Sequence, residues 1–519
     1  MKKAIYLIIA LIGLSAPSCS DSMLDFSPTD SGSGKELLKS ASTAITSVNG
    51  VYRSMWTAGW STTGNTHQCF GIAAYNLALD VMADDLIMQS QGNGWFWGDH
   101  CYNVKSNYTS SAFRSYDVWY ANYKWIANVN YIIDAEPEMA GTEADVAYVA
   151  GQAYAIRALC YLNLATWFSR APYNSLTGAS RWNEPCVPVY TTGTSIDTGG
   201  QPRESLRTVY GRIDQDIDRA IELLEKARET TLAENNKSHI NLYVALGIKS
   251  RACLAEGDWD GAFKAAKRVI DEGGYAVGTK SDLTSGMNSL DKQNVMWGAG
   301  IQVADQAGGY AGFFTHMDNK EGAYAKSAPK LISKQLYNRI SATDIRRDWW
   351  DPSDKESPYV SKKFSFANVA SFLGDYIYMR VEEMYFTAAE AALRLDDLKS
   401  ARELMNTVMA ERDPGYSANN RSGTLLGATT TTWTGSFLEN ILTHRRIELW
   451  GEYGRLFDVR RLGQGIDRRT DDGFSEECIS MMNRRNVNIT KADTYDWVLT
   501  IPKAELDANP NINEEDQNP

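Results

Sequence analysis

The stretch GNGWFWGDHCYN at 92–103 holds the residues whose types and spacing are best suited to binding chemistry. Its bulky rings stand between glycines, and helix packing does not bury an indole flanked by glycines. If the stretch is extended, its side chains alternate, so Trp95 and Trp97 form a two-ring platform on one side and Phe96 turns inward. Such a platform would stack against the apolar face of a sugar ring. The alternative is that these rings only pin a long loop to the scaffold.

The candidate ligand site combines this loop with rings from a later, loop-rich segment, which we expect to form the opposite wall. The candidate ligand-binding residues are Asn93, Trp95, Trp97, Tyr310, Trp349 and Trp350. The whole chain has 15 Trp and 27 Tyr, many of them outside the apolar stripes of the predicted helices. An excess of Trp and Tyr of this kind suits a sugar-binding or protein-binding surface.

Catalytic candidates are few. The best-placed carboxylates are Asp84 and Asp85, one turn before the aromatic loop. Two carboxylates about 5–10 Å apart can hydrolyse a glycosidic bond, although a solvated helix end is the simpler interpretation of this pair. The sequence contains no HExxH, no GxSxG, no phosphate loop and no dinucleotide-binding glycine pattern. We therefore expect a binding protein without catalytic residues rather than an enzyme.

Four residues beside the aromatic loop have side chains that zinc prefers. His67 and Cys69 stand two residues apart, and His100 and Cys101 are adjacent, so they could meet as a four-ligand site. Their spacing matches no common zinc module. An oxidising compartment favours a disulfide between Cys69 and Cys101, or no link at all. We expect neither a metal nor a cofactor.

The first residues indicate where the protein is located. Met1-Lys2-Lys3 is positively charged, an apolar run follows over 4–14, and small residues lead to Cys19. This pattern is typical of a bacterial export signal at 1–18, with lipidation at Cys19. No later apolar run is long enough to span a membrane, so we expect attachment through the lipid anchor only. The net charge of −12 argues against nucleic acid as a partner.

Apolar residues with a period near 3.6 predict two helices within 376–411, separated at Asp396-Asp397. Ala388 and Ala392 leave the first of these helices thin enough for a close neighbour. A similar pair within 240–270 is broken at 256–258, and such pairs are typical of tetratricopeptide-like repeats. Further helices are predicted over 36–58, 73–88, 116–133, 144–168, 209–227 and 437–461.

The predicted domain organisation is simple. A signal peptide (1–18) and a lipidated tether (19–35) precede one mainly α-helical domain over 36–519. Within that domain, helical pairs over about 144–270 and 376–461 flank a loop-rich insert over about 275–374. The insert contains short strand-like runs such as Val295–Trp297, and the tail IPKAELDANPNINEEDQNP is expected to be irregular.

Four features together resemble the SusD/RagB family of outer-membrane nutrient-binding lipoproteins of Bacteroidetes. They are Cys19-Ser20-Asp21, the central helix from Asp375 to Leu395, the charged stretch that starts at Arg445-Arg446-x-Glu448-Leu449, and the ending with Ile501-Pro502, Asn509-Pro510 and Gln517-Asn518-Pro519. Within the charged stretch, Arg445 with Glu448 and Arg455 with Asp458 have the i, i+3 spacing of internal ion pairs. Each such pair would contribute only about 0.2–0.5 kcal/mol to helix stability.

The resemblance implies a tetratricopeptide-like scaffold whose loop-rich inserts form the ligand face, in a lipid-anchored protein on the outer cell surface. It also implies a partner, a SusC-like TonB-dependent outer-membrane transporter on which the lipoprotein sits as a lid. The ligand implied is an oligosaccharide or polysaccharide, bound without catalysis. A peptide or protein-fragment ligand is the alternative, since some relatives bind peptides, and a glycoside hydrolase is a more distant one.

Overall fold

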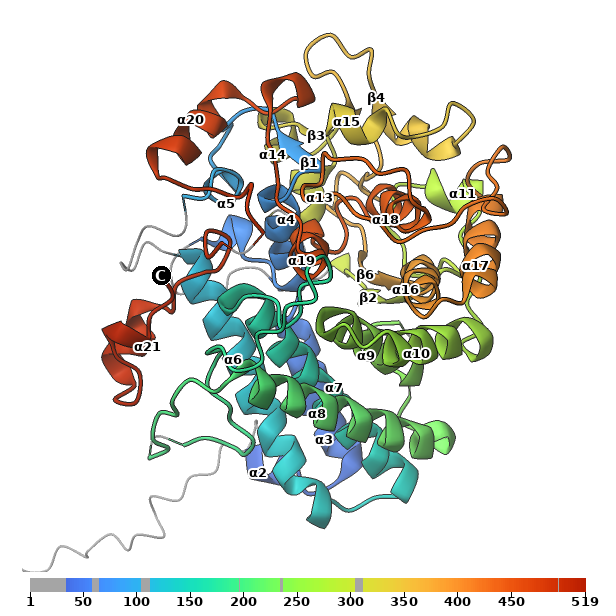
Figure 1. Ribbon diagram of the computed structural model, residues 1–519. Helices are drawn as coiled ribbons and strands as arrows, with labels where there is room; N and C mark the ends of the chain where they lie inside the picture. The colour runs from blue at the N-terminus through green and yellow to red at the C-terminus, as the bar shows by residue number, and fades with distance from the viewer. Residues whose placement is uncertain are drawn as a thin grey trace, which may run out of the picture.

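The computed structural model describes residues 34–57, 65–103, 113–195, 197–233, 237–303, 311–492 and 494–519. Within this part of the chain the protein is mainly α-helical, as predicted (Figure 1). The predicted signal peptide, the lipidation site Cys19 and the candidate ligand residue Tyr310 lie outside the described residues. No helix within those ranges is both long enough and apolar enough to cross a membrane.

In the first half of the chain, the helix predicted over 36–58 is divided into two, and the other helices begin close to the predicted positions. Their bounds there are α2 (Gly34–Leu37), α3 (Ala41–Ser54), α4 (Ile72–Met82), α5 (Trp97–His100), α6 (Phe113–Ala135), α7 (Glu143–Phe168), α8 (Leu206–Lys226), α9 (Leu242–Glu256), α10 (Trp259–Glu272) and α11 (Lys280–Leu283). The second half contains α13 (Phe313–Met317), α14 (Ala323–Ser327), α15 (Lys334–Tyr337), α16 (Val381–Arg394), α17 (Leu398–Ala410), α18 (Phe437–Glu448), α19 (Arg455–Leu462), α20 (Glu476–Arg484) and α21 (Lys503–Ala508).

The two predicted helix pairs are present, and the same kind of turn separates the helices in each. Gly257 ends α9 in a left-handed conformation with φ of 76°, and the Asp258 carboxylate caps α10 by accepting a hydrogen bond from the backbone N–H three residues further on. Asp396, with φ of 62°, and the capping Asp397 do the same between α16 and α17. Side-chain caps of this type satisfy backbone donors that the first helical turn leaves free.

The pairs stack into a repeat scaffold, which confirms the tetratricopeptide-like prediction. Helices α6, α7, α8 and α9 pack against one another in order, and α10 lies against α16. Ala262 of α10 and Ala391 of α16 share one buried cluster with Cys253 of α9. Ala388 and Ala392 are also fully buried. Small side chains at these positions allow the helix axes to approach closely.

The strands are short and antiparallel. One sheet has the order β1 (Leu86–Met88), β3 (Lys330–Ile332), β5 (Val360–Ser361), β4 (Trp350–Asp351), and the second pairs β2 (Val295–Ala299) with β6 (Tyr376–Arg380). The prediction that a helix begins at residue 376 was therefore wrong, since β6 precedes α16 and pairs with β2. The helix predicted over 73–88 likewise ends at Met82, because residues 86–88 pair with β3. The predicted strand-like run at 295–297 is confirmed.

The charged stretch is buried, and its pairing differs from the prediction. Glu448 does not pair with Arg445 but lies within 3.0 Å of the guanidinium groups of Arg346, Arg380 and Arg412. All four side chains are completely buried. The residues have an internal ion-pair role, as expected. Glu448 connects different segments of the chain, whereas Asp458 and Arg461 form an i, i+3 pair at 2.7 Å within α19. The helix predicted over 437–461 is divided into α18 and α19 by a turn that contains Gly451 and Gly454.

The C-terminal tail was predicted to be irregular, but it contains α21 and is held against the scaffold. Asn518 is buried and donates hydrogen bonds to the backbone carbonyls of Phe168 and Leu499, both at 2.8 Å. Its side-chain oxygen accepts a hydrogen bond from Arg203 at 2.9 Å. Asn509 donates to the carbonyl of Gln201 at 2.9 Å. Specific polar contacts, together with the buried side chains of Ile501 and Ile512, hold this segment against the scaffold without a continuous apolar stripe.

Candidate functional site

The aromatic loop is coiled rather than extended. The backbone N–H of Gly94 donates to the carbonyl of Gln91 at 2.8 Å, and α5 begins three residues after Gly94. Gly92 lies so close to the neighbouring chain that an added Cβ would be 2.6 Å from the Ser327 carbonyl oxygen. Phe96 adopts a left-handed conformation with φ of 61°. The alternation expected of an extended chain therefore does not apply here.

This coiling separates the two indoles that were predicted to form a platform. Asn93 is exposed and Trp95 is half-buried, whereas Trp97 is 3% exposed. Phe96 is fully buried, as predicted. Trp97 starts α5 and packs into the core beside His100, with ring centroids 5.6 Å apart. The two-ring platform is therefore wrong, and Trp95 alone of these two indoles reaches the surface.

The predicted opposite wall is also buried. The indole N–H of Trp349 donates to the carbonyl of Leu283 at 2.8 Å, and the ammonium group of Lys363 lies 4.5 Å from its ring centroid. Trp350 opens strand β4 and packs edge-on against Trp450 at 5.7 Å. Both residues are at most 2% exposed, so neither presents a ring face to a ligand in this structure.

Trp95 is supported by a small aromatic cluster that the sequence did not reveal. The ring of His67 stacks on the indole with centroids 4.9 Å apart and an interplanar angle of 15°. Tyr324 approaches the indole edge-on at 6.1 Å, and its hydroxyl is hydrogen-bonded to His67 Nδ1. His316 Nε2 donates to the backbone carbonyl of His67 at 2.6 Å. The indole of Trp95 is thus fixed in orientation while part of it stays exposed.

His316, beneath this cluster, is held in its neutral form. Burial, together with the nearby charge of Lys330, lowers its pKa to about 3. A neutral imidazole with a fixed hydrogen-bond direction suits a supporting role. The cluster thus offers a preorganised aromatic ring, and the Asn93 amide is nearby in sequence. Because the His316 imidazole is neutral, it adds no positive charge. These features suit a polar, uncharged ligand.

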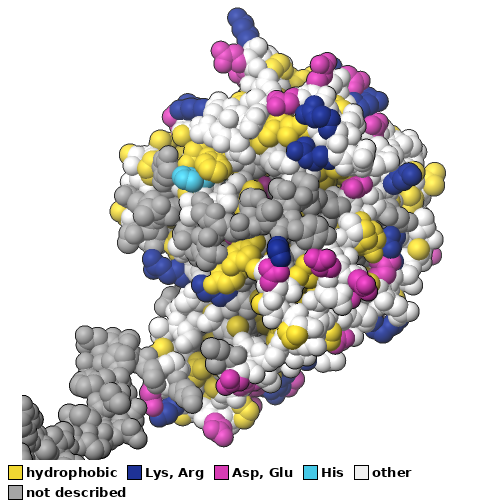
Figure 2. Space-filling view, turned by 90° about the vertical axis from the view of Figure 1, so that its left-hand side faces the viewer, with side chains coloured by type: hydrophobic (Ala, Val, Ile, Leu, Met, Phe, Trp, Pro, Cys, Tyr) yellow, Lys and Arg dark blue, Asp and Glu magenta, His cyan; other side chains and the backbone are white. Residues whose placement is uncertain are grey.

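Figure 2 shows the side of the molecule on which α5 lies, two residues after Trp95. Helices α5, α6 and α21 lie on the left-hand side of Figure 1, and that side faces the viewer in Figure 2. Hydrophobic side chains reach the surface there in several separate patches, one of which lies beside a histidine. The surface therefore offers hydrophobic contacts within a mostly polar face.

The candidate carboxylate pair is buried, so its interpretation as a solvated helix end was wrong. Asp84 and Asp85 are each at most 5% exposed and share the guanidinium groups of Arg446 and Arg455 at distances of 2.6–3.1 Å. Burial would raise the pKa of Asp84, but Arg455 and Arg446 outweigh it and lower that pKa to about 2. A carboxylate that is ionised and bound in this way positions α4 against α18 and α19.

The residues considered for zinc or a disulfide point to different partners. His67 is engaged by Trp95 and Tyr324, and His100 Nδ1 contacts the carbonyl of Val81 at 2.9 Å. Cys69 and Cys101 are buried free thiols, so the disulfide between them is not present. Among the described ranges, no cluster of three or more His, Cys, Asp or Glu side chains could hold a metal ion.

Sequence reasoning missed His67 and Tyr324 as supports of the candidate site. His67 was considered only as a possible metal ligand. Tyr324 lies 229 positions after Trp95, so the sequence does not show that the two residues are neighbours. Its place next to the loop follows from the contact of residues 327–328 with Gly92. The one indication of these supports in the sequence was the high content of aromatic residues.

Two family models match the chain. One, described as "SusD family", matches residues 325–519, and the other, described as "Starch-binding associating with outer membrane", matches residues 61–254. The segments do not overlap and together cover most of the scaffold. A search among curated proteins finds no match.

Solved structures from Bacteroides have the same fold. A SusD-like carbohydrate binding protein from Bacteroides vulgatus is 25% identical, with a TM-score of 0.73, and the match covers 92% of this chain and 98% of that chain. A SusD superfamily protein from Bacteroides thetaiotaomicron is 23% identical, with a TM-score of 0.73, over 92% of this chain and 100% of that chain. Surface glycan-binding protein A from Bacteroides thetaiotaomicron, solved in complex with laminarihexaose, is 16% identical, with a TM-score of 0.64, over 92% and 99%.

Proposed function

Because this chain belongs to the SusD family, we propose that it is a cell-surface lipoprotein that captures a glycan and delivers it to a SusC-like TonB-dependent transporter. In this proposal Cys19 carries the lipid that holds the protein at the outer membrane. The protein binds its ligand without changing it chemically. The membership of the chain in the SusD family supports the proposal, and the geometry of the Trp95 cluster supports a ligand site there.

The observation that carries the proposal is the half-buried indole of Trp95, stacked on His67 and bordered by Tyr324. Sugar rings present C–H groups on one face, and these groups pack well on an aromatic ring that is already held in place. Because His67 and Tyr324 fix the indole, little side-chain entropy is lost on binding. Asn93, exposed two residues away, supplies amide donors and acceptors for hydroxyl groups.

The experiment is a binding screen followed by one substitution. Glycan and peptide libraries are presented to the soluble protein, and the best ligand is titrated against wild type, Trp95→Ala and the control Trp259→Ala. Trp259 is also half-buried, but it lies at the start of α10, on the other side of Figure 1 from α5. We expect Trp95→Ala to weaken glycan binding about tenfold, which corresponds to about 1.4 kcal/mol.

The thermal melt separates a lost contact from a lost fold. Trp95→Ala should melt close to wild type, since the indole is only half-buried. A Trp95→Ala protein that binds its glycan normally would place the site elsewhere. A library ligand that is a peptide rather than a glycan would overturn the ligand class and leave the uptake role to be tested with that peptide.

A further inference from the structure

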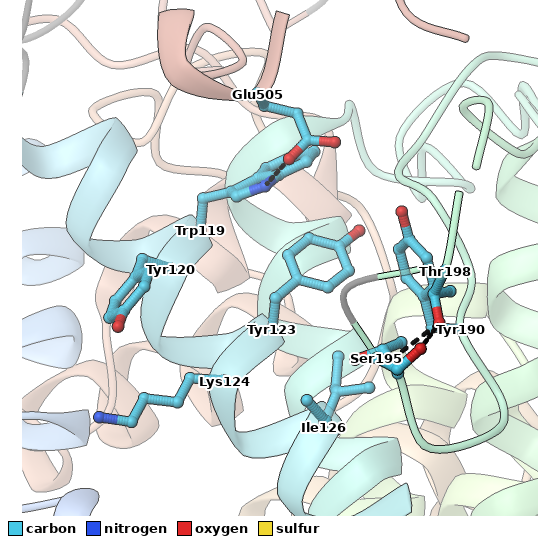
Figure 3. A pocket seen from close by; sticks show the side chains of 11 residues that line it. Trp119, Tyr120, Tyr123, Lys124, Ile126, Tyr190, Ser195, Thr198 and Glu505 are labelled. Carbon is cyan, nitrogen blue, oxygen red and sulfur yellow. Dashed lines mark hydrogen bonds between the residues drawn. The ribbon is translucent and has the colours of Figure 1, made fainter. Parts of the chain in front are cut away.

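A second aromatic cleft lies between α6, the loop that starts at Tyr190, and α21, on the same side of Figure 1 as α5. Its volume is about 470 Å³. Small-molecule sites commonly have volumes of roughly 300–1,000 Å³. Its walls include Trp119, Tyr120, Tyr123, Tyr190 and Glu505. In Figure 3 the α6 side chains lie on one side and Tyr190, Ser195 and Thr198 on the other.

The rings of this cleft are fixed before any ligand arrives. Tyr123 lies 4.9 Å from Trp119 at an interplanar angle of 49°, and 5.9 Å from Tyr190 at 89°. The Tyr123 hydroxyl donates to the carbonyl of Pro188 at 2.7 Å, and the Trp119 indole N–H donates to the Glu505 carboxylate at 3.2 Å. Rings inclined to one another around a hollow form a concave wall rather than a flat contact surface. Preorganisation of this kind reduces the entropy that binding must overcome.

The polar groups of the cleft indicate the charge of its ligand. Ser195 and Thr198 are exposed and bring hydroxyl groups to the rim. Of the described residues that line the cleft, Lys124 and Glu505 are the charged ones, and their charges are opposite. The Glu505 carboxylate is already hydrogen-bonded to Trp119. A lining of rings and hydroxyl groups with balanced charge matches a neutral, hydroxyl-rich molecule better than an ion.

We propose that this cleft is a second oligosaccharide-binding site, which takes a neutral pyranose-containing glycan. The inference rests on the proposed function for the class of ligand, but it concerns residues that share nothing with the Trp95 cluster. A protein segment is the competing occupant, because Tyr and Trp are also common at protein interfaces. The concave arrangement of inclined rings and the hydroxyl-bearing rim favour the glycan.

Two sites on one side of the molecule have a consequence for long ligands. A polymer that is held at one site reaches the second as an intramolecular event, and its overall affinity then exceeds that of either site alone by as much as about 10²–10⁴-fold. An oligosaccharide that is shorter than the separation of the two sites binds each site independently. The ratio of polymer to oligosaccharide affinity is therefore a measure of the second site.

The test counts bound hexasaccharides by isothermal titration calorimetry, with laminarihexaose, maltohexaose, cellohexaose, xylohexaose and mannohexaose as probes. Ser195→Trp fills the cleft from an exposed position, and Ser281→Trp, exposed on α11, is its matched control. We expect two sites per chain in wild type and in Ser281→Trp. Trp95→Ala and Ser195→Trp should each show one site, and the double variant none. As a second variant, Tyr120→Ala should weaken binding in the cleft about fivefold.

The outcomes separate this inference from the proposed function. One site per wild-type chain, lost in Trp95→Ala and unchanged in Ser195→Trp and Tyr120→Ala, overturns the second site and leaves the proposed function standing. Loss of hexasaccharide binding in Ser195→Trp and Tyr120→Ala but not in Trp95→Ala supports glycan binding in the cleft and contradicts the role of Trp95. No binding of any hexasaccharide to wild type overturns both. Two sites in Ser195→Trp, together with loss of a co-purifying membrane barrel, would make the cleft a protein contact instead.

Discussion

Replacing Glu448, which is completely buried in α18, with glutamine should strongly destabilise the protein. The buried ion cluster around Glu448 is balanced, since Arg346, Arg380, Arg412 and Lys363 face Asp344, Glu382, Glu448 and Glu452. Glu448→Gln keeps the shape of the side chain but leaves one positive charge without compensation. Its new amide group also directs donors toward guanidinium groups that are themselves donors.

The expected cost can be estimated from this geometry. The Glu448 carboxylate accepts hydrogen bonds from Arg346 and Arg380 at 3.0 Å and from Arg412 at 2.9 Å, with every partner fully buried. Breaking a buried pair by removing one partner typically costs about 3–5 kcal/mol. Proteins have total unfolding free energies of only about 5–15 kcal/mol. Glu448→Gln should therefore lower the urea midpoint strongly.

The same carboxylate predicts a dependence on pH. Burial opposes the ionised form of Glu448, but Arg412, Arg380 and Arg346 outweigh it and hold its pKa well below the ordinary value. A depressed pKa in the folded state contributes stability above the unfolded value of about 4.3, and this contribution is lost as the pH falls further. The difference in unfolding free energy between wild type and Glu448→Gln should thus be largest near pH 7 and shrink below about pH 4.

The assay is urea unfolding followed by tryptophan fluorescence and circular dichroism at several pH values. Glu403→Gln is the control, because Glu403 is exposed on α17 and lies 3.9 Å from Lys399, which is also exposed. Exposed pairs of this kind contribute at most about 1 kcal/mol. A loss below about 1 kcal/mol for Glu448→Gln, or one that does not change with pH, would refute this account of the cluster.

Three further predictions follow from the scaffold, the tail and the proposed anchor. Ala392→Leu should cost roughly 1–3 kcal/mol, because Ala392 is fully buried in α16; an unchanged thermal melt would show that the contact tolerates the added volume. Asn518→Ala should cost about 1–3 kcal/mol, since it leaves two buried carbonyls without their donor, whereas Asn511→Ala, in the exposed part of the tail, should cost less than about 0.5 kcal/mol. Cys19→Ala should release a folded, soluble protein, and wild type should co-purify with a TonB-dependent barrel in mild detergent. Membrane retention of Cys19→Ala in cells without the transporter would contradict lipidation at Cys19.

The helix pairs were predictable because their signals are local. The apolar stripes of α9, α10, α16 and α17 lie within single segments, and the acidic residues between the helices act as caps. Strand β6 was missed for the opposite reason. Tyr376 and Arg380 pair with residues of β2 that are about 80 positions earlier, and nothing within 376–380 alone distinguishes such a strand from the first turn of α16.

The candidate site was predicted in part. Glycine neighbours correctly suggested that an indole near residue 95 reaches the surface, but they do not show whether the loop is extended or coiled. Trp349 and Trp350 look similar to Trp95 in sequence, yet β4 and its neighbours bury them. The second cleft was not predictable in the same way. In the sequence, Trp119 and Tyr123 look like residues of the buried face of a helix. Glu505, which contacts Trp119, lies 386 positions after it.

The position of α21 determines when this second cleft is complete. Bacterial chains emerge from the N-terminus onward, so α6 and the loop at Tyr190 are available long before Glu505. Until α21 arrives, Trp119 has no carboxylate to hold its indole N–H, and the wall that α21 provides is absent. The cleft is therefore assembled among the last parts of the protein, after the repeat scaffold can already have folded. A chain whose synthesis stops before residue 505 would carry the Trp95 cluster but not this wall.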